Sequence, residues 1–383
     1  MPPAETAWRD RVRAFAEDTV APLVDDMDHK GRLDDGLVAA LFAEGLMSVE
    51  TPLRYGGQGL TFLDAVAAVE EVARICPGVA VAVDVHNILV TGAILRDGDG
   101  DQRRRYLPRL AGSVMGAFAL SEEDAGSDAF ALATVAEPDG PGWRITGRKR
   151  WTSNALAAGL FLVFARTGQR SVTAFLVDRD APGLAVAEPA DQLGMRAART
   201  ADLVLDGVPV RGDQALGGPG RGELLALRAL TLGRVGIAAQ LVGLAQGALD
   251  VAARYVTGRR QFGRPVAEFQ GVRFPLAESA AEIAAARALC YRAADAVAGG
   301  AVAGGAAEAE QIRLAAMAKY VASQAAQRAA VRAVDAMGGN GTRREHRAEK
   351  FYRDAKVGTI YEGTSNILLN AIASELLCPG RPA

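Results

Sequence analysis

The chain has 383 residues, which is long for one hydrophobic core, and half of them are hydrophobic, so we expect two or three domains. The formal charge of −2 at pH 7 leaves no excess of basic residues to neutralise phosphates, which argues against a nucleic-acid partner. No run of eighteen or more apolar residues is present, and residues 1–18 are amphipathic and charged, unlike a signal peptide. These features predict a cytoplasmic protein with no membrane partner.

The cysteines and histidines are few and scattered. Their spacings match no metal-binding motif, and three cysteines do not make a disulfide framework. We therefore predict neither a metal site nor a disulfide framework from Cys76, Cys290, Cys378, His29, His86 and His346.

Residues 1–112 are predicted to form an N-terminal helical domain, because apolar residues recur there at helical spacing. One mostly apolar stretch, residues 79–95, contains Asp84, His86 and Asn87. Polar residues in a buried helix more often form a satisfied core network than a ligand site, and we favour that interpretation. A substrate tail lying along this helix is the alternative.

Residues 113–218 are predicted to form a middle β domain. Six short runs rich in β-forming residues alternate there with Gly, Pro and Asp, as in a small antiparallel barrel or sandwich. The runs are residues 115–120, 143–146, 160–165, 173–177, 184–187 and 201–204.

Residues 219–383 are predicted to form a C-terminal helical bundle, because long Ala-rich stretches repeat apolar residues every three or four positions. The predicted helices cover residues 223–257, 272–298, 306–337 and 366–376, and paired glycines at 299–300 and 304–305 punctuate one connection. The predicted fold class is therefore mainly α with a central β domain.

Two polar stretches at strand ends could hold a ring system. Residues 121–128 bring hydroxyls and backbone amides together after a predicted strand, and Trp151 stands two residues from Ser153. Hydroxyls and amides suit the carbonyl- and nitrogen-rich edge of a flavin, and an indole offers a flat apolar face. An ordinary turn and simple core packing are the respective alternatives.

Two stretches near helix ends could contact phosphates or a cofactor. Residues 259–265 contain three arginines beside a glycine, which suits a pyrophosphate but is also typical of a solvated charged loop. Met337 is followed by Gly338 and Gly339 without the spacing or βαβ context of a dinucleotide-binding turn. A helix C-cap is sufficient to explain these glycines, and close approach to a cofactor is the alternative.

Glu362 is the candidate catalytic carboxylate. It lies on a glycine turn directly before an apolar helix, which Thr364 or Ser365 can cap. A carboxylate anchored in this way and partly desolvated can have a raised pKa and act as a general base. A surface glutamate beside a helix cap is the alternative.

The order and separation of these motifs resemble the acyl-CoA dehydrogenase family over essentially the whole chain. Residues 159–163, 175–180, 233–240 and 360–369 most resemble its short/branched-chain members. The resemblance implies an N-terminal helical domain, an antiparallel β-barrel and a C-terminal four-helix bundle. The motifs are Leu-Ser-Glu-Glu-Asp-Ala-Gly-Ser-Asp (120–128), Trp-Thr-Ser-Asn (151–154), Arg-Arg-Gln-Phe-Gly (259–263), Met-Gly-Gly-Asn-Gly (337–341), Arg-Asp-Ala-Lys (353–356) and Tyr-Glu-Gly-Thr (361–364).

The resemblance also implies FAD as the cofactor, with some of its contacts supplied by a neighbouring subunit. The implied FAD contacts are Phe118, Ala119, Leu120, Ser121, Gly126, Ser127, Trp151, Thr152, Ser153, Arg259, Gln261, Phe262, Gln270, Asp335, Ala336, Met337, Gly338, Gly339, Thr364, Ser365 and Asn366. The implied substrate contacts are Ser127, Thr231, Arg234, Glu362 and Gly363.

By the same resemblance, the chain is an oxidoreductase that converts a short or branched acyl-CoA to its 2,3-enoyl thioester. Glu362 would take the α proton while a hydride leaves the β carbon for the flavin. Electrons would pass to an electron-transfer flavoprotein or an equivalent acceptor, and the chain would form a homotetramer. Some relatives place the base just before the arginine that matches Arg234, but Gly233 stands there, so Glu362 is the single candidate.

Three departures from the family's residue pattern fall at positions where the family contacts the substrate and its pantetheine arm. Glu223 stands where an aromatic contact is expected, the segment 168–171 is short, and Thr231 and Leu232 replace a polar pair. These departures keep open the same chemistry on an acyl group bound to a carrier protein in a biosynthetic pathway. A flavin-dependent oxygenase or oxidase on this scaffold, and a flavin-free helical binding protein, are more remote alternatives.

Overall fold

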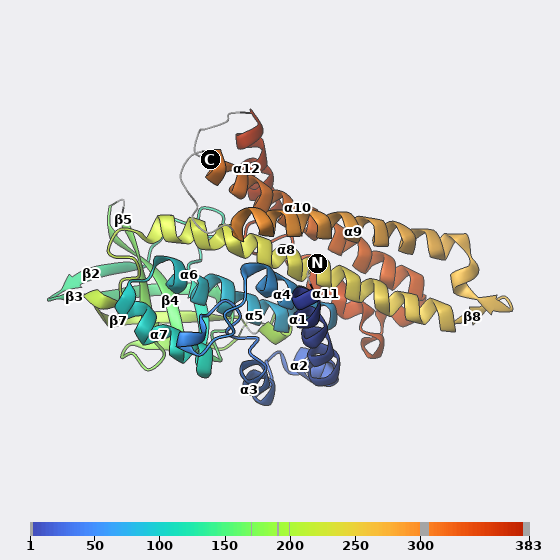
Figure 1. The fold of residues 1–383 in the computed structure, drawn as a ribbon, viewed down its shortest axis with the longest axis horizontal. Helices are drawn as coiled ribbons and strands as arrows, with labels where there is room; N and C mark the ends of the chain where they lie inside the picture. Colours follow the sequence, from blue (N-terminus) through green and yellow to red (C-terminus); the bar gives the residue numbers. More distant parts are fainter. Residues whose placement is uncertain (1–2, 170, 190, 199, 299–305, 378–383) are drawn as a thin grey trace.

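The computed structural model describes residues 3–169, 171–189, 191–198, 200–298 and 306–377. Helices come first, then strands, then helices again, which confirms the predicted order. One long helix, α8 (Gly222–Gly258), runs from the β-sheet at one end of the molecule to a small hairpin at the other, formed by β8 (Arg260–Gln261) and β9 (Arg264–Pro265) (Figure 1).

The N-terminal part consists of short helices, and side-chain caps mark the start of α3, α4 and α7. Thr61 and Asp64 form a capping box at the start of α4, and Asp99 and Gln102 form one at the start of α7. The helices and turns are α1 (Pro3–Phe15), η1 (Ala16–Val20), η2 (Ala21–Leu23), α2 (Val24–Lys30), α3 (Asp35–Ala43), η3 (Leu53–Tyr55), α4 (Phe62–Ile75) and α7 (Gly100–Gly112).

The apolar stretch predicted at 79–95 is one continuous helical run with a π-helical middle. It consists of α5 (Pro77–Asp84), η4 (Val85–Thr91) and α6 (Gly92–Asp97). By length and composition, this run and α8 could each cross a membrane, but 94% and 78% of their apolar windows are buried inside the protein. Such burial is the environment of core helices.

Seven strands form one sheet in the order β1-β4-β2-β3-β7-β6, with β5 paired to β4. The sheet is mixed, which corrects the prediction of a purely antiparallel barrel: β1 and β2 both pair with β4 in parallel. Neither strand is joined to β4 by a tight hairpin, so the connections do not enforce antiparallel pairing. The strands are β1 (Met115–Ala119), β2 (Val135–Asp139), β3 (Gly142–Thr152), β4 (Ala158–Gly168), β5 (Ser171–Asp178), β6 (Leu184–Val186) and β7 (Ala201–Arg211).

The central strand β4 is buried on both faces. Leu160, Leu162 and Phe164 pack with the apolar residues of α6 and α7, while Phe161 and Val163 pack inside the sheet's own curl. A short turn, η5 (Arg196–Ala198), lies between β6 and β7, and another, η6 (Gly212–Gln214), lies between β7 and α8. The sheet is thus covered by the helices that precede it in the chain.

The C-terminal helices α8, α9 (Gln270–Ala298), α10 (Ala306–Met337) and α12 (Ser365–Leu377) confirm the four predicted helices within two residues at each end. Further helical segments were not predicted: η7 (Val266–Glu268), η8 (Gly338–Thr342), η9 (Arg344–His346) and α11 (Ala348–Val357). The paired glycines at 299–300 and 304–305 lie outside the described residues.

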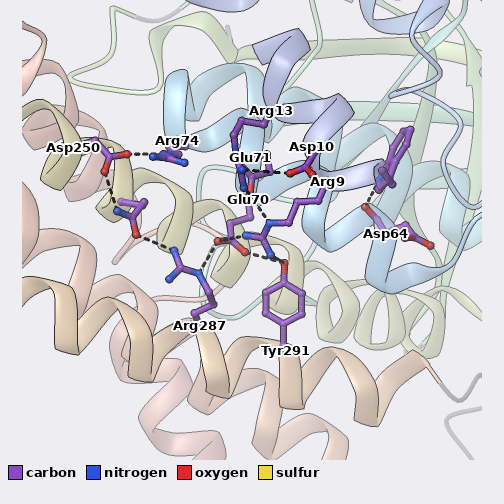
Figure 2. A network of polar contacts seen from close by, with 12 residues as sticks. Arg9, Asp10, Arg13, Asp64, Glu70, Glu71, Arg74, Asp250, Arg287 and Tyr291 are labelled. Carbon is purple, nitrogen blue, oxygen red and sulfur yellow. Dashed lines mark hydrogen bonds and ion pairs between the residues drawn. The ribbon is translucent and has the colours of Figure 1, made fainter. Parts of the chain in front are cut away.

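A buried network of charges joins the N-terminal helices to the C-terminal bundle (Figure 2). Glu71 of α4 accepts hydrogen bonds from Arg9 and Arg13 of α1. Its neighbour Glu70 accepts hydrogen bonds from Arg287 and Tyr291 of α9. Both carboxylates are only 3% exposed, so the network fixes α1 and α4 on the bundle while pairing each buried charge.

Candidate active site

Segments far apart in the sequence enclose one cavity of about 510 Å³. Its walls come from the α5–η4 run, the end of β1 and the loop after it, the end of β3, the start of α8 and residues 357–367. Most of the lining is apolar, with a small number of hydroxyl and charged groups, as in ligand sites generally. The apolar lining includes Val81, Val85, Leu89, Phe118, Leu120, Leu230, Val357, Ile360 and Ile367.

Glu362 stands on the cavity wall in the turn between α11 and α12. The backbone is left-handed at Glu362 (φ 53°) and at Gly363 (φ 95°). Thr364 then caps α12, since its hydroxyl accepts a hydrogen bond from the Ile367 amide at 3.4 Å. The turn and the helix start together hold the carboxylate at the cavity.

The Glu362 carboxylate has space beside Gly233, but one of its oxygens makes no hydrogen bond within the described structure. Its Oε2 atom is buried and has no hydrogen-bond partner among the described residues. A Cβ atom at Gly233 of α8 would lie 2.8 Å from this oxygen and 2.7 Å from Leu89, so a side chain there would displace one of them.

Burial raises the pKa of Glu362 from 4.5 to about 7, and the positive charges of Lys319 and Arg234 limit the rise. Such a carboxylate is partly ionised near neutral pH and still has a free lone pair. It is therefore equipped to accept a proton from a ligand in the cavity.

Two basic side chains approach Glu362 from different helices. Arg234 of α8 lines the cavity, and its buried Nε atom has no hydrogen-bond partner among the described residues. Lys319 of α10 is fully buried, and burial lowers its pKa to about 7 while the charge of Glu362 opposes this effect. The carboxylate therefore sits in a local positive field inside an otherwise apolar pocket.

The polar cluster on the α5–η4 run divides into two kinds of residue. His86 and Asn87 are satisfied: the His86 ring bonds the Met47 carbonyl and accepts from the Gly116 amide, and Asn87 bonds the backbone near residues 46–49. For these two the core-network prediction is confirmed. Asp84 is also fully buried, but neither carboxylate oxygen has a partner within the described structure. The cavity itself is lined by the apolar face of the run, at Val81, Val85 and Leu89.

Another part of the wall has the groups that a flavin ring needs. Ser121, Ser127 and Ser153 line it, and the Thr152 hydroxyl is buried nearby without a partner among the described residues. Trp151, which is 49% exposed, offers an indole face. Hydroxyls can bond the polar edge of the ring and the indole can cover its apolar face, so these residues fit a flavin.

A buried ion pair supports this part of the wall from behind. Lys149 of β3 donates to Glu122 at 2.5 Å and to the Leu120 carbonyl at 3.0 Å. Glu122 in turn accepts from the amides of Ala133 and Thr134. The loop after β1 is therefore fixed to β3 and to the chain that leads into β2.

The structure brings eleven of the predicted site residues to this cavity. They are Phe118, Leu120, Ser121, Gly126, Ser127, Trp151, Ser153, Arg234, Glu362, Gly363 and Thr364. Thr364 also lines a neighbouring hollow of about 380 Å³ together with Ser365 and Asn366. Ala119 points into the core of the sheet, and the Thr231 hydroxyl donates to the Leu227 carbonyl within α8.

The remaining predicted FAD contacts lie at the far end of the molecule. Arg259, Gln261, Phe262 and Gln270 are on or next to the β8–β9 hairpin, opposite the sheet (Figure 1). Along α8, Arg259 is roughly 40 Å from Arg234 at about 1.5 Å per helical residue, so Arg259 is far from the cavity of its own chain. The segment containing Asp335, Ala336, Met337, Gly338 and Gly339 is near this end as well, because the next residue, Asn340, donates to the Tyr255 hydroxyl of α8.

Sequence reasoning missed part of the wall, above all the loop that contains Met195. Met195 adopts a left-handed backbone (φ 55°), and its amide donates to Asp354 of α11 at 2.6 Å. Asp354 is also paired with Lys350. No local pattern marks the loop, because the residues that hold it are more than 150 positions away. Gln192, Met195, Ala198 and Thr200 are the lining residues from this loop.

Three family models match the chain: residues 2–113 match the acyl-CoA dehydrogenase N-terminal domain, 117–208 the middle domain and 220–377 the C-terminal domain. A probable short/branched chain specific acyl-CoA dehydrogenase from Dictyostelium discoideum is 42% identical over 379 residues, covering 97% of this chain and 90% of its own length.

Solved structures with the same fold include the butyryl-CoA dehydrogenase of Megasphaera elsdenii. It is 33% identical, with a TM-score of 0.94 and coverage of 98% of this chain and 99% of that one. The prolyl acyl carrier protein oxidase AnaB is 27% identical, with a TM-score of 0.89 and coverage of 98% and 100%.

Proposed function

The chain belongs to the acyl-CoA dehydrogenase family of FAD-dependent oxidoreductases, and we propose that it dehydrogenates short or branched acyl-CoA thioesters between Cα and Cβ, with Glu362 as the base. The observation that carries this proposal is the state of Glu362. Its carboxylate faces an apolar cavity with one unsatisfied oxygen and a pKa raised by burial to about 7.

In this reaction Glu362 accepts the proton from Cα of the thioester. When bound, FAD would be held by the serine hydroxyls and Trp151 on the same cavity and would supply the acceptor for the hydride that leaves Cβ. The products are the 2,3-enoyl thioester, a protonated Glu362 and the reduced cofactor. Val81, Val85 and Leu89 exclude water from the reacting carbons, which keeps the Glu362 pKa close to neutral.

Removal of an α proton requires stabilisation of the charge that develops on the thioester oxygen. The backbone amide of Glu362 is the donor we assign to that oxygen. Among the described residues this N–H makes no hydrogen bond of its own, so it is free to bind a ligand. Base and oxyanion donor would then come from one residue.

A second copy of the chain would complete the cofactor site. The cavity and the β8–β9 hairpin lie at opposite ends of α8, and Phe262 at the hairpin tip is 93% exposed. We propose that the hairpin, Gln270 and the segment 335–339 of one subunit reach FAD bound in another, within a homotetramer. The reduced flavin would pass its electrons to an electron-transfer flavoprotein or an equivalent acceptor.

The same chemistry on a carrier-bound acyl group is the second candidate. It is favoured by the similarity to AnaB and by Glu223, which is exposed in the first turn of α8 where the family has an aromatic substrate contact. Such a substrate would present the same thioester to Glu362, and only the contacts outside the cavity would differ.

Product analysis tests both candidates. The FAD-loaded protein is mixed with an artificial electron acceptor and with butyryl, isobutyryl or 2-methylbutyryl groups, each offered on coenzyme A and on a carrier protein. Mass spectrometry then detects a loss of two hydrogens. Conversion of the coenzyme A esters supports the first proposal, and conversion of the carrier-bound groups alone replaces it with the second. No conversion of either would reject both.

A further inference from the structure

Lys319 lies in the middle of α10, and its side chain is fully buried. Its ammonium group donates two hydrogen bonds of 2.7 Å, to the carbonyl oxygens of Tyr361 and Gly363. These residues stand immediately before and after Glu362. One ammonium group from the core of the bundle therefore holds the peptide group that precedes Glu362 and the peptide group that follows Gly363.

The turn around Glu362 requires such support. Left-handed backbone is disfavoured for glutamate and persists only where the surroundings determine it. Other bonds hold the ends of the turn: Tyr361 N to the Val357 carbonyl, and Ser365 N to the Thr359 carbonyl. Lys319 acts between them, on the carbonyls of the residues before and after Glu362.

The Tyr361 carbonyl belongs to the same peptide group as the Glu362 N–H. A positive donor on that oxygen polarises the peptide, so the N–H becomes a stronger hydrogen-bond donor. In the proposed reaction this N–H binds the thioester oxygen. The contact with Lys319 thus strengthens the amide that would bind the thioester oxygen, and it also fixes the direction of the carboxylate.

We propose that Lys319 is a positioning residue for the dehydrogenation: through the Tyr361 and Gly363 carbonyls it aims the Glu362 carboxylate and strengthens the Glu362 amide toward the thioester oxygen. The inference rests on the proposed function, in which Glu362 is the base. Lys319 acts through these carbonyls and not on the substrate, since it does not line the cavity and two of its three N–H donors bond the carbonyls.

The charged groups around Glu362 predict how the loss of Lys319 changes its ionisation. Lys319 approaches from α10, Arg234 from α8 and Asp84 from α5. Burial, and then the charge of Glu362, raise the pKa of Asp84 well above its usual range, so Asp84 is neutral and adds no charge. Without Lys319, Arg234 is the remaining cation that lowers the pKa of Glu362.

The test compares the FAD-loaded wild type with Lys319→Met, which keeps the length of the side chain but removes its donors and charge. Anaerobic mixing with butyryl-CoA gives the substrate Kd and the limiting rate of flavin reduction. We expect a limiting rate lower by about 100-fold, as for loss of an oxyanion-hole donor, with a Kd within about threefold. The pH of half-maximal rate should rise by about one unit.

Two further variants separate positioning from simple loss of stability. Lys319→Gln keeps two N–H donors without the charge. It should therefore recover part of the rate but retain the upward pH shift. If the methionine variant does not fold, the glutamine variant alone provides the test. The control is Glu71→Gln, which breaks a buried charge pair in the network between α1, α4 and α9, away from the cavity. It should lower thermal stability without moving the pH profile.

Wild-type rates and an unshifted pH profile in the folded Lys319 variants would overturn the positioning role while leaving the proposed function intact. An equal pH shift in the Glu71→Gln variant would also overturn it, because the effect would then be a general response to a damaged core. If no thioester reduces the wild-type flavin, the proposed function fails and this inference fails with it.

Discussion

Glu362 has the properties of a base because of residues that lie far from it in sequence. Gly233 leaves space for its carboxylate, Lys319 holds its backbone, and Arg234 adds a second positive charge. The raised pKa is the balance between burial and these charges. The ionisation of this residue should therefore set the pH response of the enzyme.

We expect the limiting rate of flavin reduction to rise about tenfold per pH unit below about pH 7 and to level off above it. The rate rises with pH because only the ionised carboxylate accepts the α proton. The raised pKa of Glu362 moves its ionisation to higher pH. Lys319 loses its charge over the same range, which broadens the transition. Stopped-flow absorbance across this range checks the profile, and a rate that falls as pH rises toward 7 would contradict it.

The local motif was enough to single out Glu362 and Thr364 from the sequence. The Tyr-Glu-Gly-Thr turn and the helix after it are contiguous, so neighbouring residues determine their geometry. Lys319 was not found, because a lysine in an Ala-rich helix looks like a solvated residue until the fold buries it. Met195 was missed because the residue that holds its loop, Asp354, lies far from it in the sequence.

At the scale of elements, the buried network between α1, α4 and α9 ties the N-terminal helix to the bundle (Figure 2). Burial alone would raise the pKa of Glu71, but hydrogen bonds and charges from Arg13 and Arg9 hold it below its usual value. A carboxyl with a lowered pKa stabilises the fold above its unfolded-state pKa and loses that contribution as pH falls through the folded value.

We expect Glu71→Gln to destabilise the docking of α1 by about 3 kcal/mol at neutral pH, because Arg13 loses its buried partner and Arg9 keeps only its pair with Glu70. The deficit should shrink as pH falls below the Glu71 pKa, since the wild type then loses the same charge. Hydrogen exchange of the α1 amides at two pH values measures this. Glu44→Gln, which breaks the more exposed pair with Arg11, is the control and should change exchange little. If the α1 amides exchange at the same rate in wild type and Glu71→Gln, the claim that the network stabilises the docking of α1 is wrong.

The helices and strands differ in how well the sequence predicted them. The boundaries of α8, α9 and α10 were found because long Ala- and Leu-rich periods end at Gly or Pro-containing turns. Strand β2 was missed because its residues, Val-Ala-Glu-Pro-Asp, lack an apolar alternation and its last three are exposed. The parallel pairing of β1 with β4 depends on strand order, which local pattern does not encode.

At the scale of the whole molecule, the cavity and the β8–β9 hairpin lie at opposite ends of α8, and the proposed function then makes assembly a condition for full cofactor binding. We expect Arg259→Ala to lower FAD content by at least about half and to favour smaller assemblies, because a contact to an anionic group on another subunit is lost. Light scattering and flavin absorbance on the same sample measure both effects.

The control for this prediction is Arg104→Ala, which removes an exposed arginine of α7 that pairs only with its helical neighbour Asp101 among the described residues. It should leave both assembly and FAD content unchanged. Full flavin content in a dissociated Arg259 variant would contradict the idea that FAD spans two subunits.

The central claim is that Glu362 removes the α proton of an acyl thioester in this cavity. The measurement that tests it most directly is the anaerobic bleaching of bound flavin at about 450 nm by butyryl-CoA, in the wild type and in Glu362→Gln. We expect the wild type to bleach, and the near-isosteric variant to stay yellow and bind the ligand but react slower by roughly three to four orders of magnitude. Bleaching of Glu362→Gln at the wild-type rate would show that another group takes the proton.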